Sequence, residues 1–280
     1  MLYEKFEKHW KVWLWIPIIL LVLSIGVIAN NIATKGSFME RDFELTGGKS
    51  ITFEISEVDV DAIRAELPYA TVHVTSGVSK NLIIEAPEDS DEAEIIDVVA
   101  RHASTIGEPT LRKVGASVGN IFFQQAQLAI ILAFVLMAIT VFILFRSIVP
   151  SLIMILSATT DIAITVAVLS ILGVALSLPV IAALLMVIGY SVDTDMVLTS
   201  ELLKGHGSIS SGTKRAMKTG LTMISTIFVA LVAMYFLSGS LIIEQIALVL
   251  IIATLFDAPA TWMTNAGILR YWLVKKKGRT

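Results

Sequence analysis

The chain has 280 residues and no cysteine; 55% of its residues are hydrophobic and only 16% are charged. Soluble globular domains average about 25% charged residues, so this composition excludes a wholly soluble protein and places much of the chain in lipid. The lack of cysteine excludes a disulfide framework and thiol chemistry.

The first predicted element is a membrane-spanning helix in the apolar run from residue 12 to residue 29. Tryptophans, the last of them Trp15, stand at its start, where aromatic residues mark the edge of a bilayer. The run is long for a signal peptide, and the following Asn30-Asn31 pair offers no small-residue cleavage site. We therefore expect residues 1–33 to form a cytoplasmic N-terminus and an uncleaved first transmembrane helix.

An acidic region follows the first span. Residues 35–118 contain eight Lys and Arg against sixteen Asp and Glu, a net charge of −8 in a chain whose total is −3. A stretch of this length can build one small hydrophobic core. We predict that residues 34–119 form a soluble domain. We interpret its acidic excess as a solvated face, with a specific cation or substrate site as the alternative.

The pattern inside this region predicts a ferredoxin-like α+β domain. The predicted strands cover residues 49–56, 71–75, 81–86 and 109–114, and the predicted helices cover residues 59–67 and 90–103. The order β-α-β-β-α-β is that of a split βαβ sandwich. Ser90 is the expected cap of the second helix. Its expected apolar face consists of Ala93, Ile96, Val99 and Ala100.

The sequence returns to lipid after Gly119. Five apolar segments of about 20 residues or more follow, long enough to cross about 30 Å of hydrocarbon. They cover residues 121–145, 148–173, 176–199, 219–237 and 241–269. We expect transmembrane helices 2–6 within residues 120–272 and a basic tail at 273–280. The predicted fold is thus a multi-span α-helical membrane protein with six transmembrane helices and the α+β domain between helices 1 and 2.

The distribution of Lys and Arg predicts how the chain is oriented. Basic residues flank the first span, occupy the links between spans two and three and between spans four and five, and follow span six. Six spans place all of these sites on one side, which the positive-inside rule assigns to the cytoplasm. We therefore expect a multi-pass protein of the cell membrane. Both termini are expected to be cytoplasmic and domain 34–119 extracytoplasmic.

Four aspartates within the predicted spans are the main candidate functional residues: Asp161, Asp193, Asp195 and Asp257. An ionised carboxylate at the bilayer centre costs about 2.5–3.5 kcal/mol on insertion scales, so such groups face a protein interior, a partner or a water-filled route. Burial favours the neutral form of a carboxyl group, which allows these groups to bind and release protons. We therefore treat them as proton-relay candidates.

The surroundings of these aspartates suggest specific contacts. Asp161 is expected to bond to its neighbours Ser157, Thr159 or Thr160, and Asp257 lies just before Pro259, which loosens the helix. Asp193 is expected to lie deeper in the membrane than Asp195. The alternative for Asp195 is that the helix ends there, at the cytoplasmic headgroups, and that the residue has no functional role. The two are about 200° apart around a helix and cannot share a face. Lys218 either reaches the surface or pairs with one of them.

Enzymatic sites are not predicted. The sequence has no nucleophile triad, phosphate-binding loop or metal-ligand spacing, and His73 and His102 lack ligand-spaced partners. Gly47-Gly48 is too short to cradle a nucleotide and is expected to serve a tight turn. We predict no catalytic residue, metal, cofactor or nucleic-acid partner.

Four segments of the chain resemble the SecF family, whose members form the smaller half of the SecD–SecF protein-export complex. They are Leu178–Asp193, Thr46–Gly48, Val114–Gly119 and Lys218–Thr222. Their order and the layout of one domain and six spans also match, and the Lys218–Thr222 version is similar to the archaeal branch. The glycines of these motifs, to which we assign a structural role, are Gly47, Gly48, Gly115, Gly119 and Gly189.

The resemblance implies a resistance-nodulation-division type fold that pairs with a SecD-like subunit. It implies an accessory role at the Sec translocon, driven by a proton gradient and acting on the translocating polypeptide. Asp161 matches a third-span aspartate of the family. Asp193 matches the fourth-span aspartate of SecD relatives, whereas bacterial SecF relatives commonly place Asp one residue later, at the position of Thr194 here. Lys218 stands where those relatives have an arginine linked to proton transport.

Two other functions remain open from the sequence. One is a proton-coupled exporter of small molecules or lipids from the same superfamily, which would be expected to carry two repeats and two external domains in one chain. The other is a structural membrane subunit with no transport of its own. Replacement of Asp193 by Asn tests the structural reading, because export of secreted proteins is expected to fall if the carboxylate matters and to stay normal if it is a scaffold. An exporter would instead alter the export of drugs or lipids.

Overall fold

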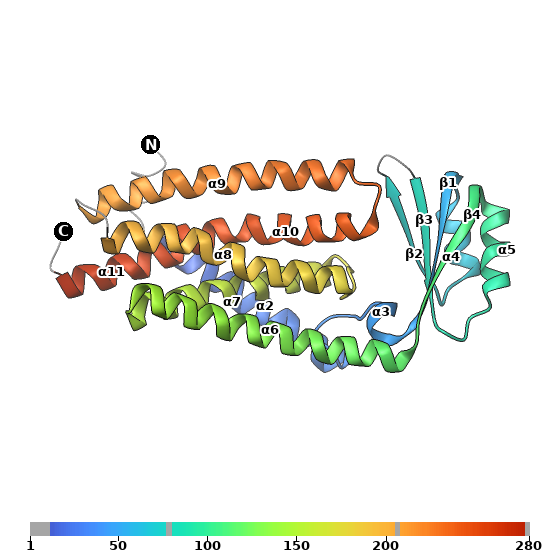
Figure 1. Ribbon diagram of the computed structural model, residues 1–280, viewed down its shortest axis with the longest axis horizontal. Helices are drawn as coiled ribbons and strands as arrows, with labels where there is room; N and C mark the ends of the chain where they lie inside the picture. The colour runs from blue at the N-terminus through green and yellow to red at the C-terminus, as the bar shows by residue number, and fades with distance from the viewer. Residues whose placement is uncertain (1–11, 77–79, 205–207, 278–280) are drawn as a thin grey trace.

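The computed structural model describes residues 12–76, 80–204 and 208–277. Within these ranges, six helical segments are long and apolar enough to cross a membrane, and they lie side by side with a small sheet domain at one end (Figure 1). The spans are α2 (Trp15–Lys35), α6 (Ala116–Phe145), α7 (Ile148–Ile171), α8 (Leu178–Lys204), α9 (Ile209–Leu237), and a sixth built from α10 (Leu241–Pro259), η1 (Ala260–Asn265) and α11 (Ala266–Lys277). The predicted six-span architecture is confirmed. The expected N-terminal segment before residue 12 and the last three residues of the tail lie outside the described residues.

The largest differences from the predicted spans lie in α9 and in the sixth span. Helix α9 begins ten residues before Thr219, at Ile209, where the Ser208 hydroxyl accepts a hydrogen bond from Ser211 N at 3.2 Å. The added turns are polar, so a hydrophobicity pattern does not reveal them. The sixth span is not one regular helix, because a π-helix follows Pro259, where the proline removes a backbone donor.

The sheet domain has the predicted order of elements, preceded by a short helix. The elements are α3 (Phe43–Thr46), β1 (Gly48–Val58), α4 (Val60–Glu66), β2 (Thr71–Ser76), β3 (Lys80–Ala86), α5 (Glu92–His102) and β4 (Ala103–Val114). The strands are antiparallel in the order β2-β3-β1-β4, the arrangement of a ferredoxin-like sandwich. The predicted fold class is therefore confirmed, although the sequence analysis missed α3.

The domain has its own hydrophobic core between one face of the sheet and the two helices α4 and α5. Ile51, Phe53 and Ile55 alternate along β1 and are at most 4% exposed, as the period-2 pattern predicts. The predicted face of α5 is confirmed only at Val99, which is buried together with Ile95 and Val98, whereas Ile96 is 41% exposed. These three buried residues share one stripe along the helix.

The cap of α5 is Asp91 rather than Ser90. The Asp91 carboxylate accepts a hydrogen bond from Ala93 N at 2.9 Å, while the Ser90 carbonyl instead accepts one from Lys49 Nζ at 2.6 Å. Both residue types cap helices well, so neighbouring candidates are not separable from sequence.

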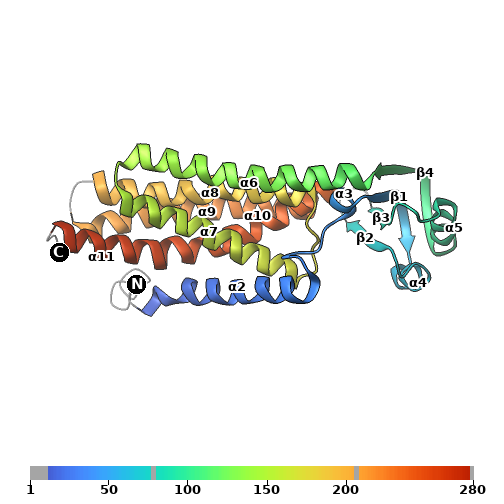
Figure 2. The ribbon, with the colours of Figure 1, turned by 90° about the horizontal axis from the view of Figure 1, so that it is seen from below.

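The opposite face of the sheet is turned toward one end of the helix bundle, with α3 between the sheet and α6 (Figure 2). Residues 40–42 form a short parallel bridge with Leu176, in the link between α7 and α8: Asp42 N donates to Leu176 O at 3.0 Å, and Leu176 N donates to Glu40 O at 2.7 Å. The domain is thus joined to the bundle by contacts beyond its two covalent connections.

Two of the glycine motifs meet at this junction. Gly47 has a φ of +88°, and a Cβ there would lie 2.4 Å from the Cα of Ala116 in α6. A Cβ at Gly119 would lie 2.9 Å from Gly47 N and from the carbonyl carbon of Leu45. Close backbone crossing therefore requires glycine at both positions. A Cβ at Gly115 or Gly189 would meet nothing within 4 Å.

Candidate functional site

The two aspartates of α8 lie in different environments. Asp195 is 1% exposed and faces the bundle interior, whereas Asp193 lies on the exposed side of the helix. This follows from their separation of about 200° around the helix axis. The sequence leaves open which of the two faces the bundle interior, and the structure shows that it is Asp195 rather than Asp193, the residue expected to lie deeper in the membrane.

Asp161 lies opposite Asp195, on α7, and is fully buried. One of its carboxylate oxygens accepts a hydrogen bond from the hydroxyl of Ser191, on α8, at 2.5 Å. The predicted partners on its own helix are wrong in part, because the hydroxyls of Thr159 and Thr160 donate to backbone carbonyls one turn earlier. Thr and Ser hydroxyls inside a helix often donate to the backbone carbonyl four residues earlier in this way.

The π-helix η1 brings donors from the sixth span to Asp195. Asn265 Nδ2 donates to Asp195 Oδ1 at 2.7 Å, and Thr261 Oγ1 lies 3.0 Å from the same oxygen. Thr261 Oγ1 also lies 3.3 Å from Asp257 Oδ1, one helical turn earlier. A π-helical turn inside a long helix frequently marks a functional site, because it redirects side chains that a regular helix would place elsewhere.

Asp161, Asp195 and Asp257 therefore form one enclosed group, which we name the carboxylate cluster. Each is at most 1% exposed, and the carboxyl groups of Asp161 and Asp257 lie within hydrogen-bonding reach of each other. Among the described residues their partners are hydroxyls, one amide and one another, and none is basic. Two facing carboxylates cannot both be ionised in a low dielectric, and one shared proton gives them the missing donor.

Each acid of the cluster also retains capacity for a further hydrogen bond. Within the described residues, one carboxylate oxygen of each accepts no hydrogen bond of ordinary length. The hydroxyl of Ser157, which lies near Asp195, makes none either. A cavity of about 20 Å³ lies beside the cluster, lined by residues that include Ser157, Thr160 and Asn265. That volume is enough for one water molecule. The arrangement can hold protons, and Asn265, which donates to Asp195, lies between the cluster and this cavity.

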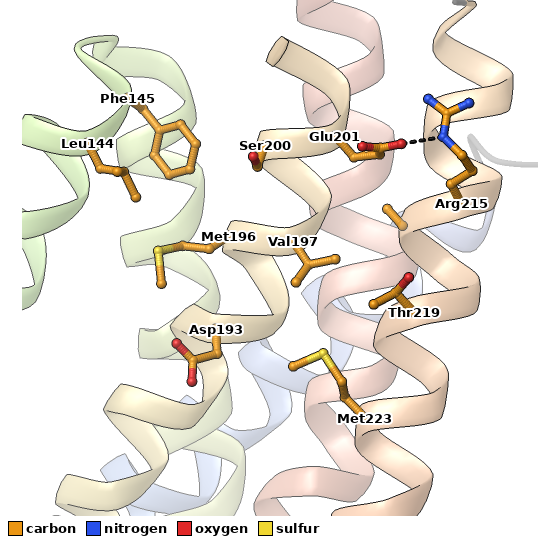
Figure 3. Close-up of a pocket in the computed structure, with 11 residues that line it drawn as sticks. Leu144, Phe145, Asp193, Met196, Val197, Ser200, Glu201, Arg215, Thr219 and Met223 are labelled. Carbon is orange, nitrogen blue, oxygen red and sulfur yellow. Dashed lines mark hydrogen bonds and ion pairs between the residues drawn. The ribbon is translucent and has the colours of Figure 1, made fainter. Parts of the chain in front are cut away.

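The other two predicted residues lie outside the cluster. Asp193 lines a groove of about 690 Å³ between the last turn of α6, the second half of α8 and the first half of α9 (Figure 3). An ion pair between Glu201 and Arg215 closes one end of the groove. Lys218 lies exposed on α9 and forms no ion pair with either aspartate of α8, so the structure does not contain the pairing considered from the sequence.

Sequence reasoning missed several contributors to the site. Thr261 and Asn265 follow Pro259 at short spacing in an apolar helix, and polar residues after a helix-breaking proline were the available signal. The glycine of the Lys218–Thr222 motif has a packing role, because a Cβ at Gly220 would lie 2.2 Å from the Trp262 ring of η1. This close approach seats the π-helix against α9.

Comparison with known proteins gives consistent results. The family "Protein export membrane protein SecD/SecF, C-terminal" matches residues 95–275. The chain is 38% identical to the protein-export membrane protein SecF of Methanolacinia petrolearia, over 94% of each chain. It is 35% identical to the protein of the same name from Pyrococcus furiosus, over 94% of this chain and 91% of the relative.

A solved structure shares the fold. The crystal structure of SecDF, a translocon-associated membrane protein from Thermus thermophilus, superposes with a TM-score of 0.74 at 22% sequence identity. The match covers 95% of this chain but only 38% of that one, so the chain spans well under half the length of the solved protein.

Proposed function

This chain belongs to the SecF family of protein-export membrane proteins, and from that premise we propose that it is an accessory subunit of Sec protein export driven by protons. The observation that carries the proposal is the carboxylate cluster. Asp161, Asp195 and Asp257 are enclosed without a basic partner among the described residues, which is a costly arrangement for a purely structural bundle.

The cluster connects three spans through a few polar contacts. Asp161 is held by α8, and Asp195 is held by η1 of the sixth span. Adding or removing one proton changes whether Asp161 and Asp257 attract or repel each other, and it therefore changes how these helices pack. Such a difference between two packings is the means by which a proton gradient drives a conformational change.

We propose that a SecD-like subunit covers the exposed side of α8. The solved SecDF chain is far longer than this chain, and the groove that contains Asp193 lies between helices whose outward faces are largely apolar. A partner helix in this groove would enclose Asp193, which the bundle by itself leaves exposed. The Sec translocon and the translocating polypeptide are the further partners of this proposal.

The proposed orientation places the sheet domain outside the cell. The start of α2 and the end of α11 lie at the end of the bundle opposite the domain (Figure 1). Basic residues accumulate at that end. They stand after α6, at the end of α8, in the first turns of α9 and in the last turn of α11: Arg146, Lys204, Lys214, Arg215, Lys218, Lys275, Lys276 and Lys277. The positive-inside rule then makes this end cytoplasmic and the cell membrane the location of the protein.

The decisive experiment replaces single acids by their amides. We expect Asp195→Asn and Asp161→Asn to abolish the part of protein export that depends on the proton gradient, because an amide keeps the shape but cannot exchange a proton. Export of a secreted reporter is measured in membrane vesicles with and without the gradient, at matched levels of the subunit. Asp97→Asn, at an exposed site of the sheet domain, is the control and is expected to behave as the parent.

The Asp193→Asn variant tests the assignment within α8. If Asp193 matters only through its contact with the partner subunit, this variant weakens copurification with the SecD-like subunit. Protein export by the assembled complex then depends on the proton gradient as it does in the parent. Normal gradient-dependent export in both Asp195→Asn and Asp161→Asn would instead favour a structural subunit without proton transport.

A further inference from the structure

The sheet domain supplies a carboxylate to the outer end of α8. Glu44, in α3, is 5% exposed, and one of its oxygens accepts a hydrogen bond from Leu178 N, the first residue of α8, at 3.2 Å. Its other oxygen accepts a hydrogen bond from Arg112 Nη2, in β4, at 2.9 Å. One buried side chain thus joins the sheet to the first turn of a membrane helix.

The remaining amides of that turn need no further partner. Pro179 has no N–H, and Val180 N donates to the hydroxyl of Ser177 at 3.3 Å. Glu44 therefore satisfies the one donor that the helix itself leaves unpaired. A negative charge at a helix N-terminus is favoured further by the helix dipole.

Helix α8 also carries groups that contact the carboxylate cluster. Ser191 and Asp195 lie on it, and about 20 Å separates Leu178 from Ser191 at 1.5 Å per residue. A regular helix transmits a shift of its first turn along its axis. The contact made by Glu44 consequently links the position of the sheet domain to the cluster.

A second acidic contact lies beside Glu44 at the same junction. Glu85, on β3, has a side chain that is 10% exposed, and it faces the carboxylate of Asp42. Burial and the Asp42 carboxylate raise the pKa of Glu85 to about 9, and Glu44 acts in the same direction. The nearby positive groups are Arg112, which opposes the shift, and His73, whose Nε2 lies 3.8 Å from Glu85. Burial lowers the pKa of His73, so it adds little charge at neutral pH.

Cavities lie on both sides of this acidic contact. One of about 250 Å³ lies between the sheet face and the outer ends of α8 and α10, and includes Glu44, Glu85 and Gln245 in its lining. Another, of about 420 Å³, lies toward the α7–α8 link and includes Asp42 and His73. Apolar contacts anchor α3 itself in the bundle, where Leu45 is fully buried in the bundle core. The contacts that Glu44 makes with β4 and with α8 are polar.

We propose that Glu44, Asp42 and Glu85 form a protonation-dependent latch that holds the sheet domain on the outer end of α8. In the closed state Glu44 bridges Arg112 and Leu178, and Asp42 and Glu85 share one proton. Loss of that proton leaves two facing carboxylates, whose repulsion separates β3 from α3 and breaks the ion pair between Glu44 and Arg112 of the sheet. This inference concerns the position of the domain and does not depend on the export role.

The direction of the pH effect follows from proton linkage. The closed state binds the Glu85 proton up to a pH of about 9, whereas an exposed glutamate releases it near 4.5. Between these values the closed state holds more protons than the open one. Raising the pH therefore favours opening, by up to about tenfold per pH unit, and the trend ends above the upper value.

The chain has no native cysteine, which allows two labels to be placed without background. Asp89→Cys in the domain and Leu172→Cys at the end of α7 are exposed positions for spin labels. Distances between the labels are measured by pulsed electron paramagnetic resonance on the full chain in phospholipid nanodiscs. We expect one short distance at pH 5 and a longer one whose share grows as the pH approaches 9.

Three variants distinguish the latch from a rigid junction. In Glu85→Gln, the longer distance is expected to stay absent at pH 9, because no second charge forms. In Glu44→Gln, it is expected already at pH 5, because the amide puts a donor against either Leu178 N or Arg112. Glu40→Gln, which removes only the exposed ion pair with Lys35, is the control and should match the parent.

Two results would overturn the proposal. The first is a parent distribution that is the same at pH 5 and pH 9. The second is a pH response that persists in Glu85→Gln. Both are read from chains that keep Glu44, so the test remains decisive even if Glu44→Gln does not fold.

Discussion

Acidic side chains have opposite surroundings in the bundle and in the sheet domain. In the domain, Glu66 lies 2.7 Å from His102 Nε2 and 2.9 Å from an Arg101 nitrogen, and these partners lower its pKa. In the bundle, Asp161 and Asp195 are enclosed by hydroxyls, an amide and another acid. Basic neighbours thus stabilise the ionised form of an acid on the domain surface. In the bundle, an acid lies where an ionised carboxylate costs free energy.

This difference shows that the number of acids in a segment says little about their chemistry. The domain has all of the acidic excess of the chain, since the remaining residues are net positive, yet most of its acids lie on solvated surfaces, where water screens the charge. The bundle has few acids, and three of them meet at one point. The functional candidates are therefore the acids whose surroundings cannot screen them.

The largest expected effect on stability comes from removing a donor inside the bundle. Asn265→Leu leaves Asp195 Oδ1 with only Thr261 as a donor, which we expect to cost about 2–3 kcal/mol, because the buried acceptor loses its shortest hydrogen bond. The thermal unfolding midpoint in detergent is the measurement. Asn30→Leu, the same change at an exposed position of α2, is the control. Equal midpoints for the two variants would show that the acids of the bundle do not need their partners.

A second prediction concerns the boundary where the two regions meet. Gly119→Ala puts a Cβ 2.9 Å from the backbone of residues 45 and 47, so we expect a loss of about 1–3 kcal/mol from overpacking. Gly189→Ala is the matched change in another span, where a Cβ meets nothing within 4 Å, and it is expected to keep or slightly raise stability. Unfolding midpoints of the two variants are compared. If they agree, the close crossing of α3 and α6 contributes nothing to the attachment of the domain.

The smallest expected effect lies on the domain surface. The pKa of Glu66 is lowered chiefly by its hydrogen bond to His102, so its stabilising contribution is present above the ordinary value of 4.5 and is lost as the pH falls through the lowered value. Glu66→Gln is expected to remove this acid-dependent loss with little change at neutral pH. Hydrogen exchange of the α4 and α5 amides, compared between parent and variant at each pH, measures it. A large effect at neutral pH would contradict the contrast between the two regions.

Much of the architecture follows directly from residue patterns. Long apolar runs predict the six spans, because a bilayer accepts few other segments. Alternation at Ile51, Phe53 and Ile55 predicts β1 and its buried face, because the residues between them, Thr52 and Glu54, are polar and lie on the other side of the strand. The pattern is less informative for α5, where Asp91 rather than Ser90 starts the helix and Ile95 rather than Ile96 enters the core.

The sequence by itself determined that acids lie within the membrane and that Asp193 and Asp195 point in opposite directions. Only the tertiary structure decided that Asp195 is the enclosed one and that Asp161 and Asp257 join it. The physical reason is that α8 has apolar residues on both its lipid side and its protein side, so no amphipathic stripe marks the interior. The π-helix after Pro259 is a second reason, because it sets the positions of Thr261 and Asn265 and the hydrophobicity pattern does not reveal it.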